Sequence, residues 1–230
     1  MTAATVSVPL IPREILFGHP ARLQPTLSPR GQHLAYLAPD DRNVMQIWLQ
    51  TPDGEPDRCL TQDQKRGIRF YTWAYDDAQI LYIQDRDGDE NWHVHAVNIN
   101  DGRDRDLTPF DQVQAGIVGL DPFFPNQLLV SLNRDDPSRK DIYRVDLTTG
   151  EMARDTVNPG QVVSWTTDAQ FQVRAAIAAT ADGGYDLIYR ASPTDNWQLI
   201  RHWDGDNSGA TLAFSTDGDT LYIKGNHFAN

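Results

Sequence analysis

Apolar and polar residues alternate in short runs along this chain, for example at Leu34 and Tyr36 or at Ile80 and Tyr82. A period of two residues is typical of a β-strand with one buried face. Each run comes after a phrase that starts with an aromatic residue or leucine and passes through a turn rich in Asp, Pro and Gly. Five copies of the phrase occur: LSPRGQHLAYL from Leu27, WAYDDAQILYI from Trp73, LDPFFPNQLLV from Leu120, WTTDAQFQVRA from Trp165 and FSTDGDTLYIK from Phe214. Their spacings of 46, 47, 45 and 49 residues indicate an internal repeat.

A second alternating strand comes after each of the first four phrases. The sequences are QIWLQT from Gln46, HVHAVNI from His93, DIYRVDL from Asp141 and DLIYRAS from Asp186. Three of them run into turns of the hairpin type, PDG at Pro52, NDG at Asn100 and TTG at Thr148. A last short strand then ends near Cys59 or Asp106. Four antiparallel strands in about 45 residues make one propeller blade, which must stack on neighbouring blades to bury both of its faces.

The predicted fold is therefore all-β, a propeller of four-stranded antiparallel blades with about four complete blades and an incomplete fifth. We expect a lead-in at residues 1–19 and the propeller at 20–230, with blades at about 20–65, 66–112, 113–158 and 159–205 and a partial blade at 206–230. The lead-in contains PREILFG, in which Pro12 and Gly18 bracket one or two helical turns. A flat β-sandwich is the rival architecture, but it gives no reason for a repeat of this length.

The incomplete fifth blade exposes a strand edge, which natural proteins avoid. Three explanations are open. The chain is a truncated propeller, or it borrows strands from another chain, or a strand around Val6 to Leu10 completes the fifth blade. Self-association through the open blade edge is a further expectation.

Composition limits the classes of partner that the chain is expected to bind. The chain has 32 Asp and Glu against 20 Lys and Arg, a net charge of -12, so nucleic acid and anionic membranes are discounted. The N-terminus lacks a signal-peptide pattern and no run is long enough for a membrane span, which predicts a cytoplasmic protein. The single cysteine, Cys59, is expected to be a small core residue.

Several segments resemble the N-terminal part of the prolyl oligopeptidase family of serine peptidases, in particular its acylaminoacyl-peptidase-like and dipeptidyl-peptidase-like members. They are IPREILFGHPARLQPTLSPRGQHLAYLAP from Ile11, RGIRFYTWAYDDAQILYIQDRDGDENWHVHAV from Arg66, DLTPF from Asp106 and DIYRVDLTTGE from Asp141. The resemblance implies a propeller that caps a C-terminal α/β-hydrolase domain with a Ser-Asp-His triad and restricts access to short peptides. Because TolB-like propellers share similar openings, a stand-alone TolB-like propeller that acts as a protein-binding scaffold is the alternative.

No catalytic residue is predicted in this chain. None of its eight serines has glycine two residues before and two after, as the nucleophile elbow of a hydrolase requires. The chain alone is therefore predicted to be inactive, with the hydrolase domain absent from it. The acidic stretch from Asp85 fails the spacing of an EF-hand loop, and His93 and His95 are interpreted as a solvated strand face. We predict no metal and no cofactor.

Asp89, Glu90, Asn91 and Arg69 are the candidate residues for a substrate or domain interface. The resemblance suggests that the GDEN loop lies at the mouth of a blade, where carboxylates could meet a peptide amine or orient the cap. The simpler interpretation is a polar turn whose side chains bond to backbone amides. Arg66, Arg69 and Arg174 could equally pair with carboxylates between blades or with a substrate carboxylate. The tryptophans Trp73, Trp92, Trp165 and Trp197 are expected in the core between blades.

Overall fold

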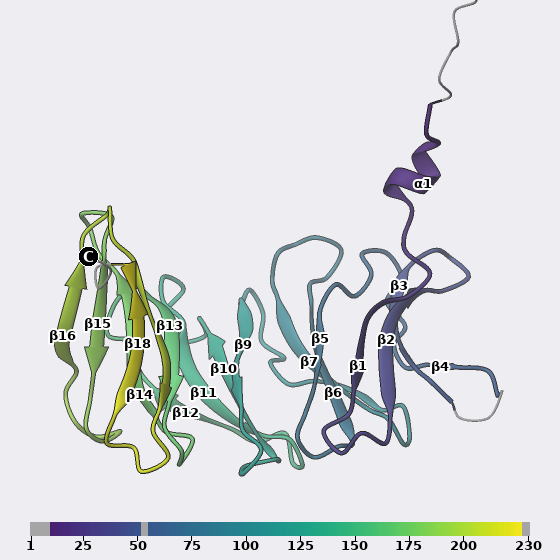
Figure 1. Cartoon of the computed structure of the whole chain (residues 1–230). Helices are drawn as coiled ribbons and strands as arrows, with labels where there is room; N and C mark the ends of the chain where they lie inside the picture. Colours follow the sequence, from purple (N-terminus) through teal and green to yellow (C-terminus); the bar gives the residue numbers. More distant parts are fainter. Residues whose placement is uncertain (1–9, 52–54, 227–230) are drawn as a thin grey trace, which may run out of the picture. The chain divides into compact units, whose positions relative to one another are not determined.

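The computed structural model describes residues 10–51 and 55–226, which form one short helix and eighteen strands (Figure 1). The helix is α1 (Arg13–Phe17). The strands are β1 (Leu23–Leu27), β2 (Leu34–Pro39), β3 (Met45–Leu49), β4 (Arg58–Cys59), β5 (Tyr71–Trp73), β6 (Gln79–Gln84), β7 (His93–Asn98), β8 (Asp104–Asp106), β9 (Ala115–Leu120), β10 (Gln127–Leu132), β11 (Asp141–Asp146), β12 (Met152–Thr156), β13 (Val162–Thr167), β14 (Val173–Ala179), β15 (Tyr185–Tyr189), β16 (Gln198–Trp203), β17 (Gly209–Phe214) and β18 (Leu221–Gly225).

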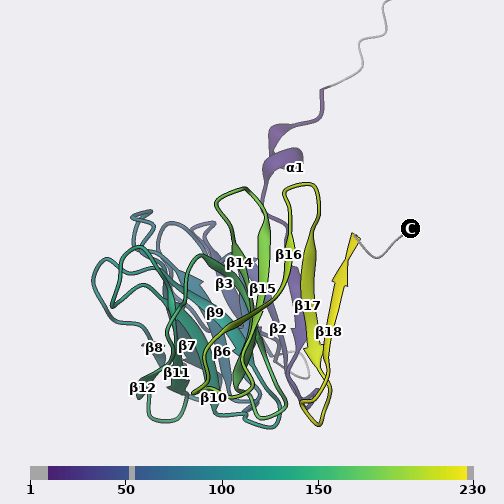
Figure 2. The ribbon, with the colours of Figure 1, turned by 90° about the vertical axis from the view of Figure 1, so that its left-hand side faces the viewer.

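The strands form four sheets of four strands and one sheet of two, all antiparallel and each in simple chain order. Within the described residues, β17 and β18 pair only with each other (Figure 2). This arrangement confirms the predicted fold class, a propeller of four complete blades and an incomplete fifth. The turn predicted at 52–54 and most of the strand predicted from Val6 lie outside the described residues.

Helix α1 confirms the helical turn predicted after Pro12. The Pro12 carbonyl accepts hydrogen bonds from the amides of Ile15 at 3.1 Å and Leu16 at 3.3 Å. Its apolar side chains are exposed, with Phe17 at 80%. No helix in the described part of the chain has the length and apolar character needed to cross a membrane.

The structure shifts the fourth copy of the repeat by two residues from the predicted alignment. Leu27, Trp73, Leu120, Thr167 and Phe214 each end the first strand of their sheet, and their spacings are 46, 47, 47 and 47 residues. Thr167, and not Trp165, is therefore the equivalent position in the fourth sheet.

The turn after the first strand explains the shift. Gly31, Asp77 and Gly218 lie four residues beyond the end of the first strand and adopt positive φ angles of 70°, 63° and 77°. In the fourth sheet this position belongs to Phe171, with φ 56°. A large aromatic residue in the left-handed region is uncommon, so the sequence pattern favours the wrong alignment on Trp165.

The chain divides into two compact units, residues 1–69 and 70–230. The first unit holds the sheet β1–β4, whose strands β2 and β3 are almost wholly buried. Its core includes a polar network around Gln46, which is fully buried. The Gln46 Oε1 atom accepts from Thr61 Oγ1 at 2.8 Å and from the Asp63 amide at 3.0 Å. These bonds hold the chain after β4 against β3.

In the second unit, consecutive sheets stack face to face. Leu128, Val130 and Leu132 of β10 pack in one buried cluster with Leu81 of β6 and Val94 of β7. Leu129, one residue out of phase on β10, packs instead with residues of the fourth sheet region. Successive side chains of a strand point to opposite faces, so the third sheet is buried on both sides.

The stacking continues to the fifth sheet, and a register shift between β13 and β14 separates Val173 from Ala175. Phe171 and Val173 join Leu129 and Ile142 between the third and fourth sheets. On the opposite face of the fourth sheet, a second cluster packs against the fifth sheet. Its members are Ala175, Ile177, Leu187 and Trp203, with Phe214, Leu221 and Ile223 packed against them.

Arginines join neighbouring sheets of the second unit at their polar margins. Arg105 of β8 donates to the carbonyl of Leu147, which lies directly after β11. Arg144 of β11 donates to the Phe171 carbonyl at 2.8 Å. Arg174 of β14 donates to the Gly218 carbonyl at 3.1 Å. Each bond thus links one sheet to the turn region of the next.

Arg190, which directly follows β15 of the fourth sheet, links back to the third sheet and is 5% exposed. Its guanidinium donates to the Val173 carbonyl at 2.9 Å, the Pro193 carbonyl at 2.8 Å and Thr156 Oγ1 at 2.6 Å. It also lies 4.6 Å from the ring centroid of Trp197. Burial lowers the pKa of Arg190. The hydrogen bonds offset part of the cost of burying this charge.

The tryptophan prediction is confirmed at two of its four positions, and the cysteine prediction is wrong. Trp73 is buried, and Trp165 and Trp197 pack on the cluster between the third and fourth sheets. Trp92 is half-buried, and a place between blades stays a prediction for both Trp73 and Trp92. Cys59 is exposed, because it lies on the two-residue outer strand β4, both of whose residues remain exposed. Partial desolvation by its neighbours raises the pKa of its thiol.

Substituting Gly209 by alanine should destabilise the second unit. A Cβ at this position would come within 2.1 Å of the Trp203 ring, which is 2% exposed and held in the core. Overpacking of this kind costs about 1–3 kcal/mol. We expect Gly209→Ala to lower the midpoint of urea unfolding of the 230-residue chain. Gly160→Ala is the matched control, since a Cβ there meets nothing within 4 Å; equal midpoints for the two variants would contradict the packing described.

Removing the Arg190 side chain should also weaken the junction of the third and fourth sheets. Arg190→Ala removes three hydrogen bonds and leaves acceptors unpaired, at a cost of about 2–3 kcal/mol in the free energy of unfolding. Thermal and chemical unfolding measure this cost. Arg103→Ala, which removes an exposed arginine, serves as the control and should change the stability little. Equal stabilities of the two variants would show that the junction does not depend on Arg190.

Candidate functional site

The loop between β6 and β7 is a polar turn organised by Asp89. The Asp89 carboxylate accepts from the amides of Asn91 at 3.0 Å and Arg86 at 3.2 Å, and from the Asn91 side chain at 3.1 Å. The hydrogen bond from the Asn91 amide is the main cause that holds the pKa of Asp89 below its usual value. Asp89 and Asn91 therefore bond to each other and to the loop backbone, as the simpler sequence interpretation expected.

Glu90 and Arg69 take no part in this network of side chains. Glu90 has φ 61°, and its amide donates to Asp85 Oδ2 at 3.3 Å. Arg69 is exposed and ends the first unit, whereas the loop belongs to the second. The structure thus defines a cluster of Asp89 and Asn91 only, and a substrate or interface role for the four residues stays a prediction.

His93 and His95 lie on the same face of β7 and pair with carboxylates of β8. The Nδ1 atom of His93 is 2.6 Å from Asp106 Oδ2, and that of His95 is 3.6 Å from Asp104 Oδ1. The His95 ring also stacks on Tyr82 at 4.9 Å between centroids. Within residues 10–51 and 55–226, no group of three or more potential ligands is arranged to hold a metal ion.

A tyrosine and a carboxylate join the second and outer strands in two of the sheets. Tyr36 of β2 donates to Asp57 at 2.5 Å, and Tyr82 of β6 donates to Asp104 of β8. Desolvation and the hydrogen bond to Asp57 raise the pKa of Tyr36 to about 12. Because the two tyrosines stand 46 residues apart, this pairing belongs to the repeat and is structural.

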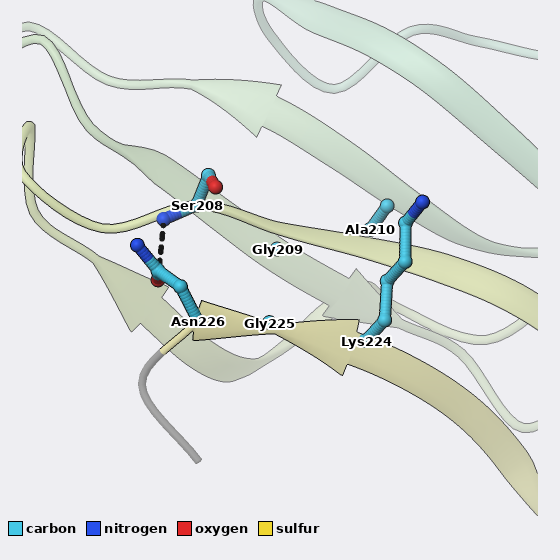
Figure 3. Close-up of a pocket in the computed structure, with 6 residues that line it drawn as sticks. All are labelled: Ser208, Gly209, Ala210, Lys224, Gly225 and Asn226. Carbon is cyan, nitrogen blue, oxygen red and sulfur yellow. Dashed lines mark hydrogen bonds between the residues drawn. The ribbon is translucent and has the colours of Figure 1, made fainter. Parts of the chain in front are cut away.

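One pocket of about 330 Å³ lies at one end of the β17–β18 hairpin (Figure 3). It is lined by Ser208, Gly209, Ala210, Lys224, Gly225 and Asn226. The Ser208 amide donates to the Asn226 side chain at 3.1 Å across the hairpin. Lys224 is the one titratable group of this lining, so it offers no acid–base pair or nucleophile.

A larger cavity of about 500 Å³ lies at the junction of the third and fourth sheets. Its lining comes from β9, β10, β13 and the residue before β11: Ile117, Val118, Ser131, Lys140, Val162, Val163, Ser164 and Trp165. Sequence reasoning missed this cavity, because its residues carry no motif and lie up to 48 positions apart in the chain. Lys140, directly before β11, was the one signal in the sequence that pointed to this cavity.

Comparisons with known proteins agree with this architecture. Dipeptidyl aminopeptidase BIII from Pseudoxanthomonas mexicana is 35% identical over 217 residues, which are 93% of this chain and 31% of that protein. Among solved structures, oligopeptidase B from Leishmania major has a TM-score of 0.61 at 11% identity and covers 88% of this chain and 30% of its own. TolB from Acinetobacter baumannii has a TM-score of 0.51 at 15% identity, with 88% and 53% covered. No protein-family model matches the chain.

The sheets and their order define an all-β, propeller-like protein. The chain spans about a third of the length of the curated relatives it matches. With the dipeptidyl aminopeptidase relative and the oligopeptidase propellers among its structural neighbours, it corresponds to the N-terminal propeller part of the prolyl oligopeptidase family. The resemblance predicted from the sequence is confirmed.

The turn at Asp89 should open at low pH. Because hydrogen bonds lower the pKa of Asp89 in the folded chain, the ionised carboxylate stabilises the turn above the unfolded pKa, and this contribution is lost as pH falls through the folded pKa. An NMR titration should therefore show the Asn91 amide signal shifting with a midpoint below the usual Asp range. Asp89→Asn, which keeps an acceptor without the charge, should remove the shift. An unchanged titration in this variant would show that Asp89 does not organise the loop.

Proposed function

We propose that this chain is the non-catalytic, substrate-gating propeller of a serine peptidase that hydrolyses short peptides. The catalytic α/β-hydrolase domain is the partner of the propeller and lies outside this chain. The protein acts in the cytoplasm and binds neither nucleic acid nor membrane. The observation that carries the proposal is the 35% identity to a dipeptidyl aminopeptidase over 93% of the chain.

The physical features of the chain support a gating role over a catalytic one. No serine of the chain has the glycine spacing of a nucleophile elbow. The second unit is instead a stack in which apolar clusters and arginine hydrogen bonds join consecutive sheets. A stack of this kind can exclude folded proteins from an active site while it admits short chains.

A stand-alone, TolB-like scaffold that binds another protein is the second candidate, and the likeness to TolB structures favours it. The two functions differ in the partner that the propeller needs. A gating cap requires a hydrolase domain, whereas a scaffold requires only another protein that binds it.

The test compares the 230-residue chain with the product of the same gene that includes any sequence after residue 230. We expect the longer product to hydrolyse chromogenic dipeptide amides, and the chain alone to match the buffer rate. A longer product without turnover that forms a stable complex with one other protein would favour the scaffold.

Gating itself is tested by loosening the stack in the longer product. We expect Gly209→Ala to raise kcat/KM for a long unfolded peptide relative to a dipeptide amide, because a less rigid stack excludes long chains less well. Gly160→Ala should leave this ratio unchanged. A ratio that stays constant in both variants would refute gating even if the peptidase activity is present.

A further inference from the structure

Five of the eight residues that line the cavity between β9 and β13 are apolar, and the other three are Ser131, Ser164 and Lys140. Ile117 and Val118 come from β9, and Val162, Val163 and Trp165 from β13. Val163 keeps 62% of its surface exposed, and the Trp165 ring packs against Trp197 at 6.1 Å between centroids. A volume of about 500 Å³ lies in the range of ligand-binding clefts. The walls therefore offer apolar contact area, with a tryptophan held in place by its neighbour.

Lys140 is the one charged residue in this lining. No carboxylate of the described residues lies within 4.0 Å of its ammonium group, although the chain has twelve more acidic than basic residues. The neighbouring Asp141 is engaged elsewhere, since it accepts from the Asn158 amide at 2.9 Å and lies 3.6 Å from Arg154. The Lys140 carbonyl accepts from the Asn158 side chain at 3.1 Å, which fixes the backbone that carries the cation.

Two strand edges flank the cavity. β9 pairs only with β10, and β13 pairs only with β14, among the described strands. Each therefore has one side whose backbone donors and acceptors are not used by its own sheet. An extended peptide can pair with such an edge while its alternate side chains enter neighbouring pockets.

We propose that this cavity binds the C-terminal end of a short peptide whose last residue is apolar. The Lys140 ammonium group pairs with the terminal carboxylate, the apolar walls take the last side chain, and the edge of β9 or β13 aligns the peptide backbone. This proposal rests on the proposed function, because it gives the propeller a peptide to select. It adds the end of the peptide that the propeller holds and the residue that holds it.

The test measures binding of a fluorescent tetrapeptide that ends in leucine, as the free acid and as the C-terminal amide, to the 230-residue chain. We expect the free acid to bind about tenfold more tightly than the amide, since a charged hydrogen bond is lost in the amide. Lys140→Gln should reduce the acid to the affinity of the amide, and added salt should do the same. Lys224→Gln, a substitution in the other pocket, is the control and should leave the preference intact.

Equal binding of acid and amide by the wild-type chain, or a preference that survives Lys140→Gln, would overturn the proposal. Circular dichroism and the unfolding midpoint of Lys140→Gln show whether the variant is folded, and Lys140→Arg should retain the preference. This outcome is separate from the proposed function. If the longer product hydrolyses peptides but the chain shows no preference for the acid, the site fails and the gating function stands. If the chain prefers the acid and no peptidase activity exists, the site stands and the gating function fails.

Discussion

Burial of both faces of each sheet is the constraint on which the second unit depends. β10 shows it most directly, because Leu128 and Leu129 are adjacent, both fully buried, and belong to different apolar clusters. A single four-stranded sheet leaves one of these faces in water. The burial of one leucine side chain is worth roughly 2–3 kcal/mol, so several such positions per sheet make the neighbouring sheet part of the stability of each. The regular spacing of 46 or 47 residues is a consequence, since each unit must return the chain to the same stacking position.

Apolar stacking does not pair the backbone hydrogen-bonding groups at the sheet margins, so other groups must bond to them. The arginines Arg105, Arg144 and Arg174 do this by donating to carbonyls of the next sheet. An arginine suits this role, because its planar group offers several donors and its stem packs on apolar surface. Arg174 also pairs with Asp168 at 3.3 Å. Of the two roles that the sequence left open for Arg174, the structure therefore shows a junction between sheets, combined with an ion pair inside its own.

The sequence predicts the strands and sheets well because the signals for them are local. Alternation in Leu34 to Leu37 or Ile80 to Ile83, and turn residues such as Gly31 and Gly218, need only a few neighbouring positions. The errors occur where the answer depends on distant contacts. Trp165 resembles the start of a repeat unit, yet its ring packs on Trp197, and the true position falls on Thr167. Cys59 has the composition of a core residue but lies on an outer strand too short to be covered.

The same reasoning explains why the loop is a weak site and the cavity a stronger one. The GDEN loop attracts attention because charged residues are adjacent in sequence, but adjacency lets Asp89 satisfy the Asn91 and Arg86 amides within the loop, which leaves less of it for a ligand. Lys140 differs from the loop residues, because it is not paired with its neighbours in sequence. Its neighbour Asp141 is engaged by Asn158 and Arg154, and Lys140 lines a cavity whose other walls come from strands far away in the chain. A binding residue in a stacked-sheet protein is thus more readily found where two sheets meet than where polar residues cluster in one loop.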